Sequence, residues 1–152
     1  MSAPIISFTD SASAYVTQFS FGIVGAGTVS NPPLSGIVWN NFQGITAVSD
    51  AISATMTALT LSGLITGDTI SDGQQIVTDL MTEIKVDSLS ETVFTPIGGQ
   101  VSHVIGSAAG GPGVLLGSVN GDGAAFELVL NVPSNATPTT ANWLLRINYI
   151  YE

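Results

Sequence analysis

The sequence predicts a mainly β protein that folds as a β-sandwich, with the jelly roll as one topology that fits. Short segments alternate apolar and polar residues, turn residues separate those segments, and only one stretch carries a clear helical stripe. The length of 152 residues suits a single domain. We therefore expect an extended N-terminal arm over residues 1–12 and one sandwich domain over residues 13–152.

The first twelve residues mix Pro4, serine and threonine with the isolated hydrophobic residues Ile5, Ile6 and Phe8. This composition is typical of an extended arm that docks on a neighbouring molecule, and equally of a frayed terminus. We take Ile5, Ile6 and Phe8 as the candidate interface residues of such an arm.

The first half of the domain shows two different periodicities. Residues 14–24 alternate with period two, which predicts a half-buried strand. After a loop that contains Pro32 and Pro33, residues 35–39 resume extended structure. Apolar residues then recur at spacings of three and four, which predicts one short helix at about residues 41–53. That stripe consists of Phe42, Ile45, Val48, Ile52 and Met56.

The stretch from residue 75 to 94 fits both periodicities. A helix would place carboxylates four residues apart in succession, where they repel. A strand would put the same carboxylates together on its solvent face, so we favour a long strand. Four further short segments follow, at residues 100–106, 113–119, 124–132 and 142–152. Asn120–Gly121 and Asp122–Gly123 predict a tight hairpin turn between two of them.

The chain carries unusually little charge. Charged residues make up 9% of it, its mean hydropathy is +0.47 and its net charge is −9. A surface this poor in charge indicates that other subunits cover much of it. Lys85 and Arg146 are the only basic residues apart from one histidine, which argues against nucleic acid as a partner. We also expect no membrane span, no signal peptide and synthesis in the cytoplasm.

The glycine-rich stretch 103–117 raises the question of a phosphate loop or a catalytic turn. Gly106 and Gly111 have the spacing of a phosphate loop, but Pro112 and Gly113 stand where lysine and serine or threonine are needed. We interpret the stretch as a mobile hairpin loop. His103 has no nucleophile or carboxylate near it in sequence, so we expect it to be packed or at an interface rather than to act as a general base. We predict no catalytic residue and no cofactor.

Carboxylates offer one further route to a site. Asp68 and Asp72 sit in a stretch that resembles a calcium loop, but Ile70 occupies a position that needs an oxygen ligand. A looser calcium site that uses Asp68, Asp72 or Asp122 stays open as a minor alternative. One histidine without cysteine does not form a usual zinc site.

Three functional classes remain: a structural subunit of an assembly, a carbohydrate-binding module and a carboxylate-dependent hydrolase. The hydrolase ranks last because the acids cluster on one face. The carbohydrate-binding module would use exposed aromatic residues, although their apolar parity favours burial. These aromatics are Trp39, Trp143, Tyr149 and Tyr151.

The whole chain resembles virion proteins of tailed bacteriophages, and capsid decoration (cement) proteins in particular. The features that carry the resemblance are strands rich in serine, threonine, glycine and alanine, the absence of cysteine, the scarcity of lysine and arginine, and the aromatic terminal segment 142–152. It implies a non-enzymatic structural protein of the virion, a homotrimer bound to a major capsid or other virion protein through its N-terminal arm. A fibre, spike or tail component fits the same pattern.

Overall fold

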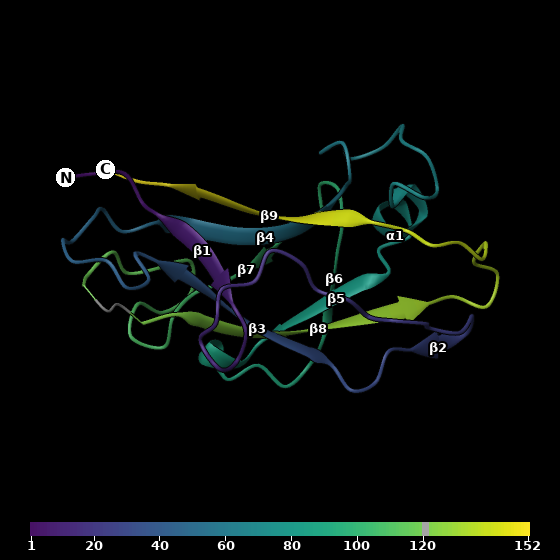
Figure 1. The fold of residues 1–152 in the computed structure, drawn as a ribbon, viewed down its shortest axis with the longest axis horizontal. Helices are drawn as coiled ribbons and strands as arrows, with labels where there is room; N and C mark the ends of the chain where they lie inside the picture. Colours follow the sequence, from purple (N-terminus) through teal and green to yellow (C-terminus); the bar gives the residue numbers. More distant parts are fainter. Residues whose placement is uncertain (120–121) are drawn as a thin grey trace.

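Two antiparallel β-sheets face each other in the computed structural model, which describes residues 1–119 and 122–152 (Figure 1). The larger sheet has the order β1-β3-β8-β5-β6, and β2 pairs with β8. Its strands are β1 (Ile6–Thr9), β2 (Thr28–Val29), β3 (Leu34–Asn40), β5 (Thr82–Val86), β6 (Thr95–Ile97) and β8 (Ala124–Val132). The smaller sheet has the order β7-β4-β9, with β4 (Ile52–Thr60), β7 (His103–Val104) and β9 (Trp143–Ile150). The predicted β-sandwich is confirmed, whereas this strand order does not establish a jelly roll.

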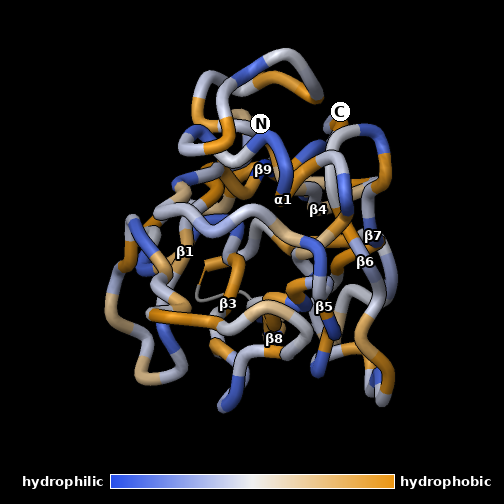
Figure 2. The backbone as a smooth tube through the Cα atoms, turned by 90° about the vertical axis from the view of Figure 1, so that its right-hand side faces the viewer, coloured by the Kyte–Doolittle hydropathy of each residue, from blue (hydrophilic) through white to orange (hydrophobic). Residues whose placement is uncertain are grey.

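The core lies between the two sheets. Figure 2 shows β4 and β9 above β3, β8 and β5, with β1 on one side and β6 and β7 on the other. Alternation in β8 turns Phe126 and Leu128 inward, and both side chains are only 1% exposed. From the other sheet, β4 contributes Met56, while Trp143, Leu145, Ile147 and Tyr149 of β9 pack on the core as partly buried residues. These inward positions of β9 are those that its alternation predicts.

The two ends of the chain lie side by side (Figure 1). The backbone N–H of Ser49 donates to the carbonyl of Ser2, and the Ser49 hydroxyl donates to the carbonyl of Glu152. The segment that leads into β4 therefore holds both termini at one end of the sandwich.

The short helix lies elsewhere than predicted. Residues 41–51 form turns and irregular structure, and β4 begins at Ile52. Asn41 and Gln43 have φ values of 67° and 56°, which a helix does not allow, and Ile45 is 94% exposed. The Asn41 side chain donates to the carbonyls of Thr46 and Gly117, which favours a turn over a helix.

The predicted long strand over residues 75–94 is also wrong in its first part. The helix α1 (Gln74–Thr78) occupies it, followed by β5 and the 3-10 turn η1 (Asp87–Leu89). Leu80 has a φ of 52°, which separates the helix from the strand. The carboxylates at positions 79, 83, 87 and 91 lie after α1, in β5, in η1 and after η1, so the repulsion that argued against a helix does not arise.

The N-terminal region needs two corrections. The predicted extended arm joins the larger sheet from Ile6 onward, because Ile6–Thr9 form β1 against β3. The strand predicted over residues 14–24 is absent, and only Tyr15 bridges to Thr9. Similarly, residues 113–119 contribute a single bridge, from Leu115 to Ala51. The turn predicted at Asn120–Gly121 lies outside the described residues.

Candidate functional site

The three candidate interface residues have different environments. Ile5 is 58% exposed, and its backbone N–H donates to the Asn40 side chain. Ile6 and Phe8 are partly buried and pack against the core. The Phe8 ring lies edge-on to Phe126 with centroids 6.3 Å apart. Of the three, only Ile5 offers a largely free side chain to a partner.

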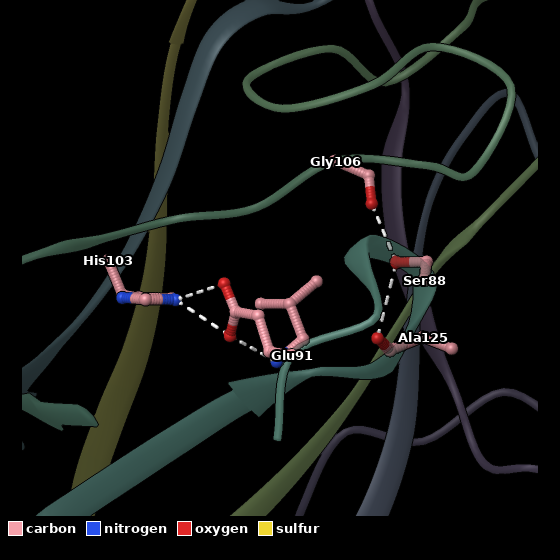
Figure 3. Close-up of polar contacts among 6 residues, drawn as sticks. Ser88, Glu91, His103, Gly106 and Ala125 are labelled. Carbon is pink, nitrogen blue, oxygen red and sulfur yellow. Dashed lines mark hydrogen bonds and ion pairs between the residues drawn. The ribbon is translucent and has the colours of Figure 1, made fainter. Parts of the chain in front are cut away.

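The structure brings together a histidine and a carboxylate that the sequence analysis did not connect. Nε2 of His103 on β7 lies 2.8 Å from Oε1 of Glu91, and their side chains are 18% and 26% exposed. The backbone N–H of Val86 donates to Oε2 of Glu91 at 2.8 Å, which fixes the carboxylate (Figure 3). The pair links β7 of the smaller sheet to the segment after η1, which connects β5 and β6 of the larger sheet. Twelve residues separate the partners, and their pairing depends on how the two sheets pack.

A histidine oriented by a carboxylate is two parts of a hydrolytic triad, which also needs a nucleophile. Ser88 is the nearby hydroxyl in Figure 3, and it donates to the carbonyl of Gly106 at 2.6 Å and lies 3.3 Å from that of Ala125. No hydroxyl among the described residues hydrogen-bonds to the His103 ring. The arrangement therefore supports a structural cross-link between the sheets, with a charge-assisted bond when His103 is protonated.

The candidate calcium ligands do not converge. Both carboxylate oxygens of Asp68 accept backbone N–H groups, from Ser62 and Thr69, and the Thr69 hydroxyl donates to Asp72. Hydrogen bonds from the Ser62 and Thr60 side chains and from these two backbone N–H groups lower the pKa of Asp68, and the Ser62 side chain contributes most. Asp122 accepts instead from the backbone N–H of Ala109. Within the described ranges, no group of three or more histidine or acidic side chains is placed to hold a metal ion.

The glycine-rich loop is packed rather than loosely attached. Ile105, Ser107 and Leu115 are fully buried, and a ladder of backbone hydrogen bonds closes the loop on itself and on Ala54. A Cβ at Gly106 would lie 2.0 Å from the carbonyl oxygen of Gly111. The glycines thus allow two backbone segments to approach closely. Backbone hydrogen bonds from Ser107 to Val114 and from Gly113 to Ile105 make the stretch a hairpin-like loop, and it packs against Ala54 of β4.

A groove of about 1010 Å³ opens between the two sheets. Its walls are the segment 16–26, β8, α1, residues 136–142 and the start of β9. Phe21 stacks on Trp143 within it, and amide groups of Gln18, Gln75 and Asn142 line it. The sequence pattern gives no sign of this groove, because the alternation of residues 14–24 predicts a half-buried strand.

The outer side of the smaller sheet and the loop beside it expose large hydrophobic side chains. Ile150 is 59% exposed and Leu144 is 40% exposed, although both lie in a regular strand. The other exposed hydrophobic residues of these elements are Leu61, Leu64, Ile65, Ile70, Val104 and Tyr151. This set, with Leu144 and Ile150, is called the β9 surface below. Large exposed apolar patches on soluble proteins mark interaction sites.

The two basic side chains have different surroundings. Nζ of Lys85 lies 2.7 Å from Glu127 and 3.1 Å from Asp87. Arg146, on the exposed side of β9, forms no ion pair with any described residue. Strand β9 therefore presents, beside the hydrophobic residues of the β9 surface, a cation that is available to a partner.

Comparison with known proteins finds no protein family whose sequence model matches this chain and no matching curated protein. Among the described residues, no helix is long and apolar enough to cross a membrane.

Proposed function

We propose that this protein is a non-enzymatic structural subunit of a viral particle, most similar in role to capsid decoration proteins. One observation carries the proposal: a chain with only 9% charged residues leaves large hydrophobic side chains exposed in its folded form, and the β9 surface is one group of them. Such a surface favours association with other protein molecules over a soluble monomer. The resemblance of the sequence to phage virion proteins supports the viral setting.

The protein would act by burying surface. Each Å² of apolar area removed from water contributes about 25 cal/mol before the costs of association, and many copies on one particle multiply the effect. The β9 surface is the proposed contact between copies. Ile5, at the end of the sandwich where the termini meet, is the proposed contact with a capsid or other virion protein.

A fibre, spike or tail component belongs to the same functional class and uses the same surfaces. A carbohydrate-binding module is the second candidate, and the groove supports it because aromatic and amide side chains are the groups that bind sugars. Against it, the face of Trp143 is already covered by Phe21. A glycan array with the wild-type protein and a Trp143→Ala variant tests this second candidate.

The first experiment is the mass of the purified native protein, measured by light scattering coupled to size exclusion. We expect a stable oligomer, and a soluble monomer over the accessible concentration range would overturn the proposal. The second experiment separates virus particles from the source culture on a density gradient and detects the chain by mass spectrometry. We expect the chain in the particle fraction, and its restriction to the soluble fraction would contradict the viral setting.

A further inference from the structure

Strand β9 is the one long strand edge that the described residues leave open. It pairs with β4 on one side only, with a register shift on β4 between Ile52 and Thr55, and Trp143–Ile150 make no backbone hydrogen bond outside that sheet. The other edges are short or protected. β7 has two residues, β6 has three and includes Pro96, and the outer side of β1 is covered where the N–H of Val16 donates to Phe8.

Natural proteins protect exposed strand edges with proline, charged side chains such as lysine, bulges or short length. β9 contains no proline, its single charged residue is Arg146, and it alternates cleanly between an inward and an outward face. Its outward side chains are Leu144, Arg146, Asn148 and Ile150. An open edge of this kind presents unpaired backbone N–H and C=O groups that another strand can bind.

We propose that β9 of one copy pairs antiparallel with β9 of a second copy about a two-fold axis at Ile147. The two three-stranded sheets then join into one continuous sheet. This inference rests on the proposed function, because it takes a second copy of the chain as the partner. The pairing joins two strand edges, and of the β9 surface it brings Leu144, Ile150 and Tyr151 to the contact.

Charge favours a second copy as the occupant of this edge. Each chain has a net charge of −9, so two copies repel wherever their carboxylates approach. The segment from residue 143 to 151 contains no carboxylate and includes Arg146, which forms no ion pair within the described structure. The two copies therefore meet where their charge is least negative.

The sequence of β9 selects one register. Residues directly opposite each other in an antiparallel pair point to the same face, so a two-fold axis must place each inward residue opposite an inward one. Centring the axis on Arg146 would bring two like charges together. Centring it on Ile147 avoids this and uses the full length of the strand. It then pairs Arg146 with Asn148, Leu144 with Ile150, Leu145 with Tyr149 and Trp143 with Tyr151 of the second copy.

This contact links two copies and is distinct from the contact that a homotrimer needs. A two-fold contact uses the same patch on both subunits, whereas a closed ring of three uses two different patches. The mass of the purified oligomer in solution therefore distinguishes a two-fold dimer from a trimer.

The first test compares two matched substitutions, Ile150→Glu on β9 and Ile45→Glu on a distant turn. Both replace an isoleucine that is more than half exposed, 59% and 94% respectively, and both add one negative charge. We expect Ile150→Glu to raise the dimer dissociation constant about tenfold or more, measured by sedimentation. We expect Ile45→Glu to leave it unchanged, and circular dichroism checks that both variants fold.

The second test reads the register directly and does not depend on a destabilising change. The chain has no cysteine, so the single variants Arg146→Cys and Asn148→Cys each carry one thiol. In the proposed register, position 146 of one copy lies directly opposite position 148 of the other copy. Position 146 of one copy is only a diagonal neighbour of position 146 of the other, and the same holds for position 148. We expect an equimolar mixture to form a disulfide-linked dimer of the two variants faster than either variant links to itself.

The outcomes separate this inference from the proposed function. A dimer that Ile150→Glu weakens and the mixed cysteine variants trap supports the β9 contact. An oligomer that Ile150→Glu leaves intact, with no preferred linking in the mixture, overturns the β9 contact and leaves the structural role standing. A wild-type monomer at all concentrations overturns both.

Discussion

The ring of Phe21 stacks on the indole of Trp143, with centroids 5.7 Å apart and planes inclined by 8°. This contact ties the segment 17–24 to the first residue of β9. The segment makes no backbone–backbone hydrogen bond, so its side chains hold it across the open side of the sandwich. Phe19 assists by packing edge-on against Phe126, with centroids 6.0 Å apart.

Removing the stack should release the segment without unfolding the sandwich. We expect Phe21→Ala to lower the free energy of unfolding by about 1–3 kcal/mol, less than a fully buried phenylalanine, because Phe21 is only partly buried. In a Trp39→Phe background, the emission of Trp143 should shift to longer wavelength. Ile23→Ala, at a fully exposed position of the same segment, is the control and should change stability by less than about 0.5 kcal/mol. Equal losses in the two variants would contradict the role of the stack.

The sequence best predicts those strands that have one apolar face and one polar face. β8 spans the residues expected from its alternation, and β9 turns inward the residues that its pattern assigns to the core. Residues 14–24 carry an equally clear alternation, yet they form no strand. Phe19 and Phe21 hold the segment by side-chain packing, and residues 17–24 make no backbone hydrogen bond to a neighbouring strand. Alternation indicates that a segment has an apolar side, whereas a strand also needs backbone hydrogen bonds to a neighbouring strand.

The other misses have the same origin in tertiary structure. The helix prediction at residues 41–53 relied on a stripe that includes Ile45, which the fold leaves exposed, while buried hydrogen bonds from Asn41 fix a turn. The pairing of His103 with Glu91 depends on two sheets meeting, and no local pattern reports it.

Asn40 on β3 is a polar link within the core. It is 1% exposed, its Nδ2 donates to the carbonyls of Ser49 and Leu115, and its Oδ1 accepts the N–H of Ile5. Asn40→Ala would remove the hydrogen bonds to the carbonyl of Ser49 and the N–H of Ile5, and would leave the carbonyl of Leu115 with the N–H of Ala51 alone. We therefore expect a loss of about 2–4 kcal/mol in urea unfolding. Asn148→Ala, on the exposed face of β9, provides the control for monomer stability. A loss below about 1 kcal/mol for Asn40→Ala would show that water replaces these bonds.

Gly106 allows the packed glycine-rich loop to close. Its missing Cβ is required because the carbonyl oxygen of Gly111 lies 2.0 Å from where that atom would be. We expect Gly106→Ala to destabilise the protein by about 2 kcal/mol or more, because two backbone segments must move apart. Ala108→Ser at the exposed tip of the same loop should be nearly neutral. Similar melting temperatures for Gly106→Ala and the wild type would indicate that the loop adjusts freely.

Lys85 should make stability depend on pH in the alkaline range. The hydrogen bond from Lys85 to Glu127, together with that to Asp87, raises the pKa of Lys85 above its ordinary value of 10.5. The folded state therefore holds the proton more tightly than the unfolded chain. The resulting stabilisation is fully present below pH 10.5, and it is lost as the pH rises through the pKa of the folded protein.

We expect Lys85→Met to be less stable than the wild type by about 1 kcal/mol or less between pH 8 and 10, the range typical of salt bridges near the surface. The difference should shrink as the pH rises toward 12, when measured by urea unfolding. Arg146→Met removes the same charge from a residue without an ion pair in the described structure, and arginine stays protonated throughout this range. Its difference from the wild type should therefore be constant with pH. A constant difference for Lys85→Met as well would show that Glu127 and Asp87 do not hold the Lys85 proton.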